Sequence, residues 1–108
     1  MKKPGTVIVT ALVAALVCIM FFSSVAMASE WFLKMNNAHG CKVLKAGEPT
    51  GSNQFYNEMA SFQSLKQACE GAHTRTDLTG SSNLKCHHFD NASVARCKEV
   101  GVSGLPGM

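Results

Sequence analysis

The sequence of 108 residues lacks the short motifs on which many common chemistries depend. It has no Cys-x-x-Cys, the spacing that allows one thiolate to be stabilised and then resolved by its neighbour, so neither a thiol oxidoreductase nor covalent haem attachment is indicated. A Gly-x-Ser-x-Gly nucleophile motif is missing, and so are phosphate-binding loops and dinucleotide fingerprints. We therefore expect a protein that is not an enzyme and that carries no cofactor.

The N-terminus, by contrast, carries a clear export signal. Residues 1–3 (Met-Lys-Lys) are basic, residues 7–22 are almost wholly apolar, and residues 25–28 read Val-Ala-Met-Ala. This order is typical of a secretory signal peptide, and we predict cleavage after Ala28. A membrane anchor is disfavoured because a spanning helix needs roughly 20 apolar residues. Cys18 lies inside the apolar core, which argues against a lipidated cysteine.

Cleavage changes the apparent charge of the protein. Residues 29–108 hold eight Lys and Arg against seven Asp and Glu, so the net charge falls from +3 to +1. A nearly neutral domain has no basic footprint for nucleic acid. The basic start and the short segment before the cut favour a bacterial source. We expect a single periplasmic or secreted domain with no membrane span in its mature form.

Cleavage also turns five cysteines into four, Cys41, Cys69, Cys86 and Cys97. An even number in a short exported chain is typical of two disulfides. If the last segment is a strand that returns across a two-residue loop, Cys86 lies opposite Cys97. We therefore prefer the pairs Cys41–Cys69 and Cys86–Cys97. If that segment is a helix, Cys97 would instead meet Cys41 or Cys86.

Hydrophobic periodicity predicts the remaining elements. Alternation indicates strands at 31–35 and 41–45, joined by a turn rich in Asn and Gly. Apolar residues recur at helical spacing over 55–69, with Gly71 as the stop, although a break near Ala60 and Ser61 remains an alternative. Alternation then favours strands at 73–78 and 84–89.

The C-terminal part is ambiguous. Residues 91–100 form either a helix, capped by Asp90 and ended by Gly101, or a strand; the helix is slightly favoured. Residues 102–108 are rich in Gly and Pro and are expected to form a flexible tail. The predicted fold is α+β: a small antiparallel sheet in ββαββ order with one helix packed on a face, stapled by two disulfides.

Two sets of residues are candidates for a site. His39, His87 and His88, with Met35 and Met59, offer ligands for copper or zinc. Adjacent histidines on a strand point to opposite faces, however, and the cysteines are better used in disulfides, so we expect no metal site. Trp31 is a candidate anchor for a partner or a cell-wall glycan, although a tryptophan in a strand more often packs in the core.

These observations favour a small exported domain that binds a protein or an envelope component. One alternative is a periplasmic protein that handles copper or zinc. Another is a secreted effector or toxin. The sequence alone does not separate the three.

Overall fold

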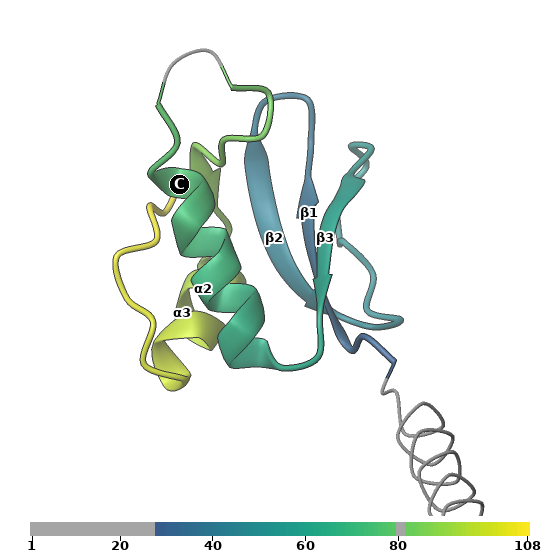
Figure 1. The fold of residues 1–108 in the computed structure, drawn as a ribbon. Coiled ribbons are helices and arrows are strands. Elements are labelled where there is room, and N and C mark those ends of the chain that lie inside the picture. Colours follow the sequence, from purple (N-terminus) through teal and green to yellow (C-terminus); the bar gives the residue numbers. More distant parts are fainter. Residues whose placement is uncertain (1–27, 80–81) are drawn as a thin grey trace, which may run out of the picture.

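The computed structural model describes residues 28–79 and 82–108 (Figure 1). The predicted signal peptide lies outside the described residues, apart from Ala28. The elements are β1 (Trp31–Met35), β2 (Gly40–Lys45), β3 (Asn57–Phe62), α2 (Leu65–Thr76), β4 (His88–Phe89) and α3 (Asn91–Glu99). The α+β class is confirmed, but the order is βββαβα rather than ββαββ.

The four strands form one sheet in the order β3-β1-β2-β4, and both helices cover the same face of it (Figure 1). β1 pairs antiparallel with β2 and with β3, whereas β4 runs parallel to β2. The sheet is therefore mixed, and the prediction of a purely antiparallel sheet is wrong. The parallel pairing arises because the chain crosses from β3 through α2 before it returns beside β2.

The predicted hairpin of β1 and β2 is confirmed, with Met35 opposite Cys41 next to the turn. The Asn36 side chain organises that turn, since its Oδ1 accepts hydrogen bonds from the backbone N–H groups of Ala38 and Gly40, both at 2.9 Å. His39 has a φ of 63°, a left-handed conformation that few residues other than glycine adopt.

The helix predicted over 55–69 is wrong in its first half, where β3 lies. The register of β3 against β1 shifts between Leu33 and Lys34, because Leu33 faces Ala60 while Lys34 faces Glu58. Met59 is thus an extra residue in a β-bulge, and it packs against the core alongside Ala60. The bulge interrupts the alternation of inward and outward side chains along β3. The apolar residues of this strand therefore recur at a spacing typical of a helix.

α2 begins after Ser64, whose hydroxyl accepts a hydrogen bond from the N–H of Gln67 at 3.1 Å. Its buried residues are Ala68, Cys69 and Ala72. Gly71 lies inside the helix rather than at its end. A Cβ at this position would lie 2.6 Å from the Phe62 ring, so a larger residue would not fit. The glycine therefore serves close packing against β3, and its predicted role as a stop is wrong.

The strand predicted at 73–78 is also wrong, since α2 continues to Thr76 with Asp77 as its C-cap. The threonine hydroxyls of this last stretch bond back along the helix, Thr74 to the carbonyl of Glu70 and Thr76 to that of His73. Such bonds satisfy β-branched polar residues within a helix. Of the strand predicted at 84–89, only His88 and Phe89 pair with the sheet.

α3 confirms the helical alternative for 91–100. Asp90 is its N-cap, and Gly101 follows its end with a φ of 82°. Ser93 joins the helix to the sheet, because its buried hydroxyl accepts the Val43 N–H at 2.9 Å.

The C-terminal residues, predicted to be a flexible tail, are packed against the core. Leu105 is buried among the core residues, and the carbonyl of Pro106 accepts the Phe89 N–H at 2.8 Å. Gly107 forms a β-bridge with Phe89. The last segment thus continues the edge of the sheet beyond β4.

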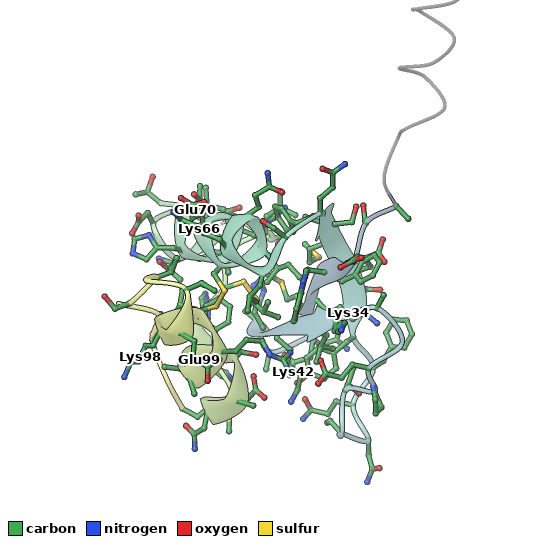
Figure 2. The ribbon with its side chains drawn as sticks, turned by 90° about the horizontal axis from the view of Figure 1, so that it is seen from below. Lys34, Lys42, Lys66, Glu70, Lys98 and Glu99 are labelled. Carbon is green, nitrogen blue, oxygen red and sulfur yellow. A yellow bond between two sulfur atoms is a disulfide. The ribbon has the colours of Figure 1, made fainter. Side chains whose placement is uncertain are left out.

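Two disulfides cross-link the domain, one within the helical layer and one beside the sheet, but their pairing differs from the one we preferred. Cys41 bonds to Cys86 and Cys69 bonds to Cys97, and all four side chains are buried. Because residues 91–99 are helical, Cys97 faces α2 rather than a neighbouring strand, and Cys86 is left to meet β2. Viewed along the layers, the sulfur atoms lie inside, while Lys66, Glu70, Lys98 and Glu99 point outward from the helices (Figure 2).

Buried disulfides of this kind indicate an oxidising, extracytoplasmic location. Within residues 28–79 and 82–108, no helix is both long and apolar enough to cross a membrane.

Candidate functional site

The most developed concavity lies at the turn end of the hairpin, and we call it the Asn36 cleft. It has a volume of about 370 Å³. Its polar lining comes from three segments of the chain and comprises Asn36, Lys42, Ser52, Gln54, Tyr56, His88 and Asp90. The cleft exists only because the hairpin, the loop before β3 and the loop after β4 meet at this edge.

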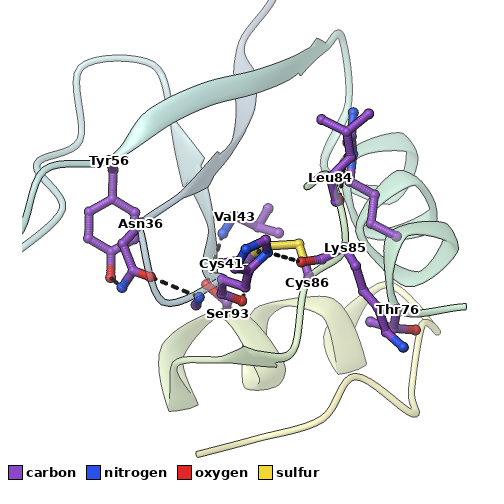
Figure 3. The surroundings of a disulfide bond; sticks show 12 residues. Asn36, Cys41, Val43, Tyr56, Thr76, Leu84, Lys85, Cys86 and Ser93 are labelled. Carbon is purple, nitrogen blue, oxygen red and sulfur yellow. Dashed lines mark hydrogen bonds between the residues drawn. A yellow bond between two sulfur atoms is a disulfide. The ribbon is translucent and has the colours of Figure 1, made fainter. Parts of the chain in front are cut away.

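Asn36 is the organising residue of the cleft and is nearly buried. Its Nδ2 donates to Gln54 Oε1 at 2.7 Å and to the Tyr56 hydroxyl oxygen at 3.2 Å, as Figure 3 shows for Tyr56. With Oδ1 already holding the turn, the side chain is fully used. Gln54 and Tyr56 each accept a hydrogen bond from Asn36. The Gln54 amide N–H groups and the Tyr56 O–H are therefore not used by Asn36 and can donate to another group.

The charged groups of the cleft neutralise each other. Lys42 Nζ lies 3.2 Å from Asp90 Oδ2 and 5.8 Å from the centre of the Tyr56 ring. Asp90 Oδ1 accepts the Ser93 N–H as the cap of α3, so both carboxylate oxygens have partners. The side chains of the cleft thus present hydrogen-bonding groups without a free charge.

His88 lines the cleft over Gly40. A Cβ at position 40 would lie 2.6 Å from His88 Nε2, so this ring position requires a glycine beneath it. Within the described residues, the ring of His88 makes no hydrogen bond, and it is half-buried. It is therefore available to a ligand as a donor or an acceptor.

The other two candidate histidines lie together, away from His88. The rings of His39 and His87 are stacked, with centroids 4.8 Å apart and planes 18° from parallel. Stacked rings direct their lone pairs along parallel planes, which does not suit two ligands of one ion at about 2.0–2.1 Å. Among residues 28–79 and 82–108, no three or more His, Cys, Asp or Glu side chains are grouped to hold a metal ion.

Trp31, the candidate anchor, packs partly against the core and is covered by Arg96, whose guanidinium lies 5.1 Å from the ring centre. Arg96 also makes a two-pronged ion pair with Glu48, at 2.8 and 2.9 Å. Hydrogen bonds from Arg96 and from the Lys45 N–H lower the pKa of Glu48 from 4.5 to about 2. This cluster anchors the loop after β2 to α3 and does not line the Asn36 cleft.

Reasoning from the sequence singled out His88 only as a candidate metal ligand, and it did not identify the cleft. Asn36 looked like ordinary turn chemistry, and Gln54 and Tyr56 lie 18 and 20 residues further along the chain. The sequence offers one signal, which is the turn that Asn36 begins. The residue with left-handed backbone in this turn is His39, where a glycine would be usual.

Comparisons with known proteins add no relative: no family model, no curated protein and no solved structure matches the chain. The site must therefore be interpreted from its own geometry.

Proposed function

We propose that the chain is an exported, non-enzymatic binding domain, periplasmic or secreted, that recognises a protein or an envelope component through the Asn36 cleft. The observation that carries this proposal is the set of pre-positioned hydrogen-bonding groups in the cleft. The Gln54 amide and the Tyr56 hydroxyl are held by Asn36, the His88 ring lies over Gly40, and all three retain unused bonding capacity. Such fixed polar groups bind without the cost of ordering them first.

The same geometry favours binding over hydrolysis. Ser52, His88 and Asp90 all line the cleft, but a catalytic triad needs a hydrogen bond from serine to histidine and another from histidine to the acid. The Ser52 hydroxyl accepts the Gln54 N–H at 3.1 Å, and Asp90 is committed to Lys42 and to the cap of α3. In the part of the chain that the structure describes, the His88 ring forms no hydrogen bond with Ser52 or Asp90.

Site-specific photocrosslinking tests the proposal. A photoreactive amino acid is placed at Ser52, which is exposed in the cleft, or at Gln67, which is exposed on α2. The exported protein is irradiated in intact cells, and adducts are identified by mass spectrometry. We expect one defined protein or glycan adduct from position 52 that position 67 does not give, and the purified component should then bind the unlabelled domain.

Two outcomes would contradict the proposal. Identical adduct patterns from both positions would mean that the cleft is not the recognition site. No adduct from either position, with the protein exported and oxidised, would count against a binding domain altogether.

A further inference from the structure

We propose that Met35, Met59 and His39 form a binding site for a soft monovalent metal ion, Cu(I) in chemical type. The three residues line a second cavity of about 320 Å³, which shares Asn36 with the Asn36 cleft but is otherwise lined by different residues. The proposal is independent of the binding function proposed for that cleft. Its basis is that two thioethers and one imidazole, carried by β1, by β3 and by the turn between β1 and β2, line the same cavity.

The two methionines reach the cavity by different structural means. Met35 ends β1, where it is buried and faces the core side of the sheet. Met59 is the extra residue of the bulge in β3, and the bulge turns it toward the same side. Bulges commonly re-aim a side chain next to a functional site. Without this bulge, strict alternation would direct residues 59 and 60 to opposite faces.

The hydrogen bond of His39 prepares its ring as a ligand. Its Nδ1 lies 2.9 Å from the carbonyl oxygen of Lys85. Since a carbonyl oxygen only accepts, Nδ1 carries the proton and the neutral ring keeps its lone pair on Nε2. Metal-binding histidines characteristically use one nitrogen in this way to orient the other. His39 Nε2 has no partner among the described residues.

Two further features hold the ring in place. His39 adopts a left-handed φ of 63°, a conformation that costs free energy in any residue with a Cβ and that clusters at functional sites. Stacking on His87 fixes the plane of the ring. The disulfide between Cys41 and Cys86 holds the two segments that carry these histidines against each other.

The donor set selects the kind of metal. Among the described residues, those that line the cavity include no Asp, no Glu and no cysteine. Thioethers and imidazole are neutral and soft or intermediate donors, which suit Cu(I) and its redox-inert analogue Ag(I). Zn(II) favours thiolates, imidazoles and carboxylates, so two thioethers are poor ligands for it. We expect Ag(I) to bind and Zn(II) to bind weakly or not at all at this site.

The methionines of residues 29–108 provide a matched test, since Met35 and Met59 line the proposed site while Met108 lines the Asn36 cleft. The oxidised protein, labelled with ¹³C at the methionine methyl groups, is titrated with Ag(I), which needs no reductant and leaves the disulfides intact. We expect the methyl signals of Met35 and Met59 to shift together and to saturate at one equivalent, while that of Met108 stays in place. Parallel shifts of all three, or no shift, would overturn the proposal.

Substitutions then separate ligation from folding. Competition with a chromophoric Cu(I) chelator should show affinity reduced by about 10-fold or more in Met59→Leu and in His39→Asn, since asparagine tolerates the left-handed backbone. Met108→Leu should bind as the unchanged protein does. Equal affinity in all three variants, with both disulfides intact by mass spectrometry, would refute the site.

Discussion

Removing the disulfide between Cys69 and Cys97 tests how the two helices are held against each other. The perturbation is the double change Cys69→Ala with Cys97→Ala, which leaves no unpaired thiol. Both side chains are fully buried, and the bond is the covalent link between α2 and α3. Within residues 28–79 and 82–108 no other cross-link replaces it, because the second disulfide joins β2 to the loop before β4.

The expected loss follows from the length of the closed loop. The two cysteines are 28 residues apart, and chain entropy assigns such a loop a stabilisation of about 3.6 kcal/mol. A domain the size of residues 29–108 has a net stability of roughly 4–12 kcal/mol. The change therefore removes about 30–90% of the free energy of unfolding. The corresponding change at Cys41 and Cys86, 45 residues apart, should cost about 4 kcal/mol.

Urea unfolding followed by Trp31 fluorescence measures this loss, since Trp31 is the only tryptophan and packs against the core. We expect a lower midpoint in the variant, with a steeper dependence on urea because the unfolded chain is less constrained. A loss below about 1 kcal/mol would refute the reasoning. It would mean that packing alone fixes α2 against α3.

Three further changes test other parts of the structure. Glu48→Gln should cost about 1 kcal/mol near pH 7, since Glu48 is 34% exposed and solvent weakens its pair with Arg96. Because folding lowers the pKa of Glu48 from 4.5 to about 2, the stabilisation by this pair is full above pH 4.5 and is lost as the pH falls toward 2. The urea unfolding curves of the variant and the unchanged protein should therefore converge near pH 2. Ser93→Ala should cost about 1–3 kcal/mol in the same assay by leaving a buried N–H unpaired, and no loss would contradict the role of its hydroxyl. Gly40→Ala should displace the His88 ring and shift its NMR signals, whereas unchanged signals would contradict the close packing.

The sequence was most informative where the signals are local. The hairpin follows from alternation next to a turn of Asn and Gly, and α3 follows from the Asp90 cap and Gly101. Each of these signals acts within a few residues, so no knowledge of the tertiary structure is required.

The errors share a tertiary cause. The bulge at Met59 gives the apolar residues of β3 a helix-like spacing, so this strand was predicted as a helix. Gly71 was predicted to end a helix, but it lies within α2, where it makes room for the Phe62 ring. The cysteine pairing depended on whether α3 packs against α2, which spacing along the chain does not reveal. The Asn36 cleft was hidden for the same reason, since its residues meet only after the sheet has formed.

The central claim is that the Asn36 cleft recognises the partner, and two adjacent histidines offer its most direct test. His88 lines the cleft, whereas His87 is exposed and stacks on His39 outside it. The measurement is the Kd, by calorimetry, of the component captured at position 52 for the unchanged protein, His88→Ala and His87→Ala. Loss of one hydrogen bond worth about 1–1.5 kcal/mol predicts a Kd weakened about 5- to 13-fold in His88→Ala and unchanged in His87→Ala. Equal Kd values for all three proteins, or a greater loss in His87→Ala, would contradict the account.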